Sequence, residues 1–181
     1  MVMAEATNHY FKHLGVSDGL SQVCIPSIYQ DELGAVWLGT TEGLNRYNGK
    51  DVRVFQPSES NHGLTNNEIN ELCGDKNGRM YIRSGNDLIK LDIYTEQFTC
   101  LRQKGVYGLF CKKDTLWVSC ADGIYYYTGQ GTELTFFARV QKGFVGRALY
   151  VDRETVWVVT RKYLVAISRE DPLRQEILLT L

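Results

Sequence analysis

One pattern recurs four times along this chain, and it constrains the fold more than any other feature. The first copy begins at Asp31, continues through Gly34 to the apolar run around Trp37, and ends in strand-like residues after Gly43. The aromatic residues at the matching positions are Trp37, Tyr81, Trp117 and Trp157, separated by 44, 36 and 40 residues. Periods of this size, with strand-like content, indicate an array of stacked β units.

Each copy is expected to begin with a tight turn. Asp31 and Gly34 fit positions i and i+3 of a type I turn, in which the aspartate side chain caps the backbone. The same spacing returns at Asp75 and Gly78. The other two copies depart from it, with Lys113-Asp114 in the third and with Asp152 and Thr155 in the fourth. We interpret these aspartates as turn residues and not as catalytic carboxylates.

The strand after each turn explains why the units must stack. In Val36-Trp37-Leu38 and Val156-Trp157-Val158, both alternating sets of side chains are apolar, whereas a strand with one wet face would alternate. Such strands must be covered on both faces, as in a β-propeller blade that lies between two others. We therefore predict an all-β chain, a single partial propeller domain over 1–181, with four four-stranded antiparallel blades. The blades are expected at residues 23–56, 68–102, 105–138 and 144–180, and residues 8–14 are expected to add an N-terminal outer strand.

The repeat is defined by structural positions. They are Asp31, Gly34, Trp37, Gly39, Thr40, Gly43, Asp75, Gly78, Tyr81, Trp117, Gly123 and Trp157. The three tryptophans are expected to be buried between neighbouring blades. Because each repeat supplies its own outer strand, four blades are expected to form an open arc cut from a larger propeller. Its uncovered faces and strand edges predict self-association.

Composition excludes several classes of partner. Twenty basic and 21 acidic residues give a formal charge of -1, so no basic excess favours nucleic acid or an anionic membrane surface. No apolar run approaches the roughly 18 residues of a membrane-spanning helix, so membrane contact is expected only through a downstream part. The first five residues lack the charged and apolar regions of a signal peptide.

Residues for catalysis, cofactors or metals are not evident, and we predict none. The three histidines have no metal-ligand spacing, and no phosphate-cradling glycine loop or nucleophile motif occurs. The carboxylate pairs Glu68/Glu71 and Asp31/Glu32 are interpreted as turn or surface groups. The five cysteines are widely spaced, without a Cys-x-x-Cys pair, and are interpreted mostly as buried free thiols; they are Cys24, Cys73, Cys100, Cys111 and Cys120.

The first copy also resembles a known repeat. From Asp31 to Tyr47 it reads Asp-x-x-Gly-x-x-Trp-x-Gly-Thr-x-x-Gly-Leu-Asn-Arg-Tyr, which is similar to the two-component regulator propeller repeat. The lead-in from Tyr10 to Ser21 looks like the usual beginning of that family's sensor region. The resemblance is strong in the first copy and moderate in the second. In the other two it depends on spacing and on the Trp-centred strands.

The resemblance implies signal reception. In that family the propeller is the N-terminal, periplasmic part of hybrid two-component sensors, as in gut Bacteroides-type bacteria that use complex polysaccharides. It therefore implies a non-catalytic sensing domain, a polysaccharide-derived oligosaccharide ligand, and transmission to a histidine kinase absent from this chain. Two alternatives stay open: a constitutive protein-binding scaffold, and a propeller glycan hydrolase or lyase. The binding residues stay unidentified, although one residue of the run Tyr125-Tyr126-Tyr127 is a candidate sugar platform.

Overall fold

The computed structural model describes residues 12–57, 63–140 and 148–180. Its strands form four sheets of four, each antiparallel and ordered as in the chain. The strands are β1 (Ser27–Gln30), β2 (Val36–Thr40), β3 (Gly43–Tyr47), β4 (Val52–Phe55), β5 (Ile69–Gly74), β6 (Arg79–Ser84), β7 (Asp87–Asp92), β8 (Gln97–Arg102), β9 (Val106–Lys112), β10 (Thr115–Cys120), β11 (Gly123–Tyr127), β12 (Thr135–Ala138), β13 (Ala148–Val151), β14 (Thr155–Val159), β15 (Tyr163–Ser168) and β16 (Gln175–Thr180). A 3-10 turn, η1 (Val16–Asp18), precedes them.

The prediction of an all-β chain with four four-stranded blades is confirmed. Each blade is a meander of hairpins, so every strand pairs with its sequence neighbour. The strand expected over residues 8–14 is not confirmed: most of it lies outside the described residues, and residues 12–14 are not in a strand.

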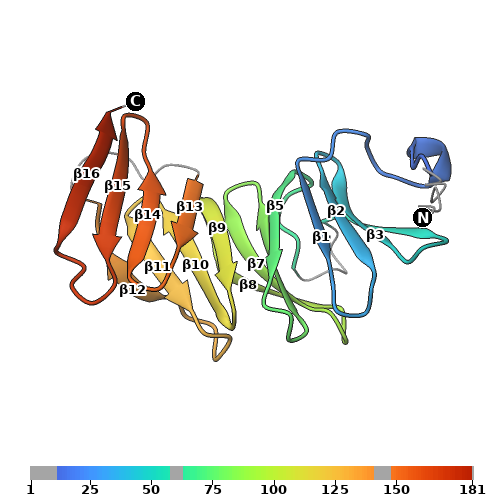
Figure 1. Cartoon of the computed structure of the whole chain (residues 1–181). Helices are drawn as coiled ribbons and strands as arrows, with labels where there is room; N and C mark the ends of the chain where they lie inside the picture. The colour runs from blue at the N-terminus through green and yellow to red at the C-terminus, as the bar shows by residue number, and fades with distance from the viewer. Residues whose placement is uncertain (1–11, 58–62, 141–147, 181) are drawn as a thin grey trace, which may run out of the picture.

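The blades stand side by side in chain order (Figure 1). Neighbouring blades meet mainly through their first strands, where β1 contacts β5, β5 contacts β9, and β9 contacts β13. The first and fourth blades lie at opposite ends of the row, so the sheets form an open arc and not a closed disc.

Three apolar clusters join the blades, one at each junction. Trp37 belongs to the cluster between the first and second blades, Tyr81 to the next and Trp117 to the third. Their exposed fractions are 0%, 0% and 4%. The repeated aromatic residue thus points in each case toward the following blade, and its burial depends on that blade being present.

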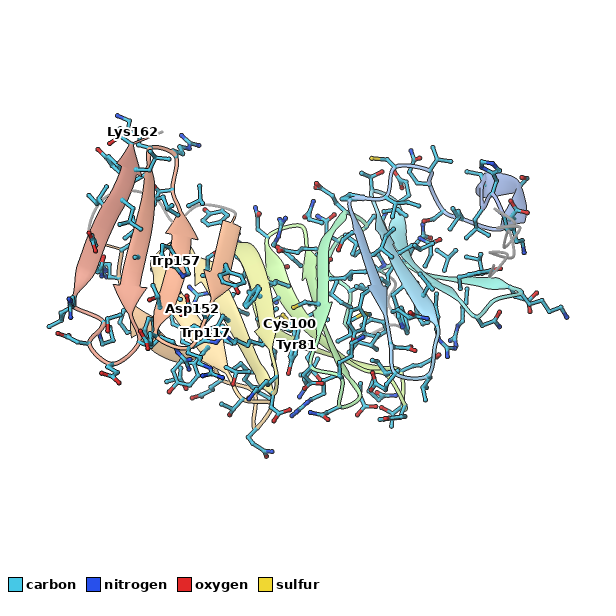
Figure 2. The ribbon with its side chains drawn as sticks, viewed as in Figure 1. Tyr81, Cys100, Trp117, Asp152, Trp157 and Lys162 are labelled. Atoms are coloured by element: carbon cyan, nitrogen blue, oxygen red, sulfur yellow. The ribbon has the colours of Figure 1, made fainter. Side chains whose placement is uncertain are left out.

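Trp157 departs from the expectation of burial. Its neighbours Val156 and Val158 belong to the cluster shared with the third blade, whereas Trp157 is only half-buried and lies outside it. Because side chains alternate along a strand, Trp157 faces away from the third blade, where no described blade follows. Figure 2 labels it on the last blade of the row. Tyr150, the cross-strand partner of Trp157, is also exposed, although its ring centre lies 5.0 Å from that of Phe110 in the third blade.

Small residues of the repeat allow close packing within and between blades. At Gly39, a Cβ atom would lie 2.8 Å from Cγ2 of Ile69 in the next blade. Gly43 has a φ of +131°, and a Cβ there would lie 2.8 Å from the carbonyl oxygen of Phe55. Between them, the buried Thr40 hydroxyl donates a hydrogen bond of 2.8 Å to the Gly43 carbonyl oxygen. These positions therefore shape the hairpin from β2 to β3.

Candidate ligand-binding groove

The turn aspartates hold the tryptophans in place. Asp31 accepts hydrogen bonds from the backbone N–H groups of Leu33 and Ala35, at 3.0 and 2.9 Å, and from the indole N–H of Trp37 at 2.7 Å. Asp152 repeats the arrangement in the fourth blade, where it accepts the Trp157 indole N–H at 2.8 Å. These carboxylates accept hydrogen bonds from backbone N–H groups of the turn and from the indole N–H, which supports their interpretation as structural residues.

The second blade has a different bond in place of the one between the turn aspartate and the indole. Asp75 still caps its turn through the backbone N–H of Asn77, at 2.8 Å, but its second oxygen accepts from the guanidinium of Arg79. The hydroxyl of Tyr81, which stands in for the indole, is buried and has no hydrogen-bond partner within the described residues. Burial raises the pKa of Tyr81.

A groove lies between the third and fourth blades, at the end where their first hairpins turn. It consists of two adjoining hollows of about 480 and 450 Å³. Both hollows share Thr115, Trp117, Arg153 and Arg169. The other lining residues are Lys112, Lys113, Asp114, Tyr126, Thr128, Phe137 and Glu170. The groove thus combines aromatic side chains with more cations than carboxylates.

The aromatic side of the groove is built on Trp117. Its ring centre lies 5.0 Å from that of Phe137, edge to face, and 5.6 Å from that of Tyr126. Tyr126 and Phe137 are half-buried, so part of each ring faces solvent. The indole N–H of Trp117 makes no hydrogen bond within the described part of the chain and is not among its buried unsatisfied groups. An apolar wall with one polar donor suits a sugar ring.

Two of the four cations of the groove are hydrogen-bonded to other described residues and two are not; Lys112, one of the former, donates to the Val151 carbonyl oxygen at 2.8 Å. The Arg169 guanidinium lies 5.4 Å from the Trp117 ring centre and donates hydrogen bonds of 3.0 Å to the carbonyl oxygens of Asp152 and Arg153. The side chains of Lys113 and Arg153 are exposed and make no hydrogen bond or ion pair with other described residues. They are therefore available to an anionic ligand.

Among the groove residues, sequence reasoning singled out Trp117 as a structural position, Lys113-Asp114 as a turn, and Tyr126 as one of three tyrosines that could offer a sugar platform. The other repeat positions lie along the successive blades and do not gather into one site. Arg153 and Arg169 were missed, because both belong to the fourth blade and approach Trp117 of the third blade only when the two blades stack. The Tyr125-Tyr126-Tyr127 run does alternate as expected: Tyr126 packs with the cluster toward the fourth blade, and its two neighbours face the second.

The carboxylate pairs noted in the sequence form no separate site. Glu71 is not a surface group as expected: it lies at the junction of the second and third blades, where it pairs with Arg83 at 3.4 Å and accepts the Leu109 backbone N–H at 3.1 Å. Burial raises the pKa of Glu71, and Arg83 opposes that shift. Glu68 accepts from the side chain of Asn70 at 2.6 Å.

Two kinds of feature are absent from the described residues. Among them, no group of three or more histidine, cysteine, aspartate or glutamate side chains is arranged to hold a metal ion. None of them forms a helix with the length and apolar character that a membrane crossing needs.

The first repeat matches a known family of repeats. Residues 19–42 match the family "Two component regulator propeller". The chain is also similar to Histidine kinase P4 of Formosa agariphila, with 38% identity over 53 residues. That match covers 29% of this chain and 4% of the relative, so the chain corresponds to a small part of its length.

Comparison with solved structures extends the likeness to nearly the whole fold. The extracellular domain of a protein described as a hybrid two component system of B. thetaiotaomicron aligns with a TM-score of 0.76 and 21% identity, covering 93% of this chain and 26% of that one. PorZ, a surface component of the type-IX secretion system of Porphyromonas gingivalis, aligns with a TM-score of 0.70 and 17% identity, over 92% of this chain and 24% of its own. The chain is thus a segment of β-propeller blades whose first repeat, over residues 19–42, matches the two-component regulator propeller family.

Proposed function

We propose that this chain is a non-catalytic, ligand-sensing propeller segment of a hybrid two-component sensor, located outside the cytoplasmic membrane. The observation that carries the proposal is the match of the first repeat, over residues 19–42, to the two-component regulator propeller family. The similarity to a histidine kinase and to the extracellular domain of a two-component system supports it. PorZ shares the fold in a different system, so the fold by itself does not decide the function.

The ligand that best suits the groove is an acidic oligosaccharide, with carboxylate or sulfate groups. The half-buried rings of Tyr126 and Phe137 offer apolar area to the C–H faces of sugar rings. Lys113 and Arg153 have no partner among the described residues, and each can donate charge-assisted hydrogen bonds to an acidic group. A neutral sugar would leave these two cations unused, so the charge of the ligand determines its affinity.

Signal transmission follows from differential affinity. A ligand shifts an equilibrium between two arrangements of a sensor only as far as its affinities for the two differ. The groove lies at a junction between blades, and a bound ligand contacts side chains from both of them. Binding therefore favours one relative position of the third and fourth blades, which is a change that a downstream kinase can detect.

Isothermal titration of the purified chain tests this proposal. Uronate oligosaccharides are compared with neutral oligosaccharides of the same length, and only the acidic series is expected to bind. Arg153→Ala and Lys113→Ala should each weaken binding by about tenfold, the value of one hydrogen bond to a charged group. Lys162→Ala is the matched control, because Lys162 is an exposed cation at the opposite end of the fourth blade (Figure 2).

Three outcomes would contradict the proposal. Equal weakening by Lys162→Ala would mean that binding reflects general charge and not the groove. Shortening of the oligosaccharide during the titration, detected by chromatography, would favour the glycan hydrolase or lyase alternative. Absence of binding to every glycan tested would favour the scaffold.

A further inference from the structure

Two of the five cysteines meet across a blade junction. The Sγ atoms of Cys73 and Cys111 lie 2.7 Å apart, although the residues are 38 positions apart in the sequence. Cys73 is on β5 and Cys111 on β9, the first strands of the second and third blades. Both are free thiols and both are half-buried. The expectation of buried thiols holds only for Cys120, since Cys24 and Cys100 are exposed.

The register of the two strands makes this meeting specific. Two residues before the cysteines, Glu71 of β5 accepts the backbone N–H of Leu109 of β9 at 3.1 Å. Side chains two positions apart lie on the same face of a strand, so Cys73 follows Glu71 toward the third blade. Leu109, Cys73 and Cys111 also belong to the same apolar cluster. The hydrogen bond and the cluster thus hold the two sulfurs together.

We propose that Cys73 and Cys111 form a disulfide that joins the second and third blades. A sulfur–sulfur bond is about 2.05 Å long, so a small rotation of the two side chains closes the gap. The oxidant is a small-molecule disulfide, of which glutathione disulfide is an example. The Cys111 thiolate attacks one sulfur of this oxidant, forms a mixed disulfide and releases one thiolate. The Cys73 thiolate then attacks Cys111 Sγ and releases the second.

The exchange is balanced. Two protein thiols are oxidised, one oxidant disulfide is reduced to two thiols, and the two protein protons pass to the released thiolates. Cys111 is assigned the first attack because burial, together with the neighbouring Cys111 sulfur, raises the pKa of the Cys73 thiol. A thiol with a raised pKa supplies less thiolate for attack on an external oxidant.

The disulfide would stiffen the centre of the arc. It would fix the junction between the two middle blades, and an oxidising compartment such as the periplasm would sustain it. Only its occurrence in the cell rests on the proposed function. The pairing itself depends on the fold, so it can be tested without any ligand.

The experiment uses the purified full chain. It is reduced, freed of reductant, exposed to glutathione disulfide and then alkylated and digested with trypsin. Cleavage after lysine and arginine separates all five cysteines, with Cys73 in the peptide 54–76 and Cys111 in the peptide 105–112. The expected product is these two peptides linked, lighter by two hydrogen atoms than their sum. Oxidation should raise the midpoint of thermal unfolding by about 5–10 °C.

Controls make the result decisive. A Cys24→Ser/Cys100→Ser background removes the exposed thiols and should leave both the linked peptide and the thermal shift unchanged. In that background, Cys111→Ser should abolish both. Oxidation in denaturant should give mixed pairings, because only the fold selects this pair. Recovery of both peptides in alkylated or glutathione-bound form from the folded, oxidised chain would overturn the proposal. That failure would leave the glycan titration, and with it the proposed function, unaffected.

Discussion

Two tryptophans at the same repeat position share an indole hydrogen bond but differ in burial, and this allows a direct test of blade stacking. Trp37 and Trp157 each donate an indole hydrogen bond to a turn aspartate, at 2.7 and 2.8 Å. Trp37 is fully buried against the second blade, whereas Trp157 is half-buried on the uncovered face of the fourth. Trp37→Ala should therefore destabilise the chain much more than Trp157→Ala.

The magnitudes follow from the buried area. A tryptophan buries about 150–250 Å², which at about 25 cal/mol per Å² corresponds to about 4–6 kcal/mol. Large-to-small changes of this kind cost about 3–5 kcal/mol in practice. We expect about 4 kcal/mol for Trp37→Ala and about 2 kcal/mol or less for Trp157→Ala. The buried Asp31 also loses a donor that water cannot easily replace, which widens the difference.

Urea unfolding followed by far-ultraviolet circular dichroism, at low protein concentration, measures both variants. The shift of the midpoint relative to the wild-type chain gives each loss of stability. Equal losses in the two variants would refute the reasoning, because they would mean that another surface covers Trp157 in solution. An unchanged midpoint for Trp37→Ala would refute the assigned stacking of the first two blades.

Three further predictions follow from particular contacts. Tyr81→Phe should be neutral or stabilise the chain by about 1 kcal/mol, because it removes a buried hydroxyl without a described partner. Tyr127→Phe should destabilise the chain by about 1 kcal/mol, because it loses a 2.7 Å hydrogen bond to the Gly131 carbonyl oxygen. The reverse order of the two variants in urea unfolding would contradict both expectations. The pKa of Asp152 is lowered below its ordinary value of 3.8 by hydrogen bonds from the Trp157 indole and from the backbone N–H groups of Glu154 and Thr155. The ionised Asp152 therefore stabilises the fold above pH 3.8, and this stabilisation is lost as the pH falls through the folded-state pKa. The thermal midpoint of Asp152→Asn should therefore lie below that of the wild-type chain at neutral pH and converge with it in acid; a constant gap would exclude this origin. Finally, the uncovered face of the fourth blade predicts concentration-dependent association, which Trp157→Arg should weaken; sedimentation that shows a monomer at every concentration would contradict it.

Most of the fold was predictable because the repeat carries its own constraints. Apolar residues on both faces of a strand require cover on both sides, and turn residues at a fixed spacing mark the hairpins. The strand Val36–Thr40 follows directly from those signals. The half-burial of Trp157 was not predictable, since it depends on the presence of a following blade and not on the residues around Trp157.

The candidate site was mostly beyond sequence reasoning. A groove between blades joins residues that are far apart in the chain, and no spacing rule relates Lys113 to Arg153 or Arg169. The same holds for Cys73 and Cys111, whose separation of 38 residues matches no short cysteine motif. One signal was available: the two residues lie close to one repeat period apart, so they occupy corresponding positions on neighbouring blades. Such equivalent positions face each other when the repeats stack side by side.

The groove lies where the repeat departs most from its own pattern. In the first and fourth blades a turn aspartate binds the indole N–H, but the third blade has Lys113-Asp114 at this turn and leaves the Trp117 N–H without a described partner. A repeat protein needs its shared positions for stacking, so those positions can change little without loss of stability. Asp114 of this turn still accepts a hydrogen bond from the side chain of Asn77 in the second blade, but Lys113 and the Trp117 N–H make no such bond with described residues. Under the proposed function, ligand binding accounts for the exposed Lys113 and the unpartnered indole N–H, and the third blade's turn is the place to look for that ligand.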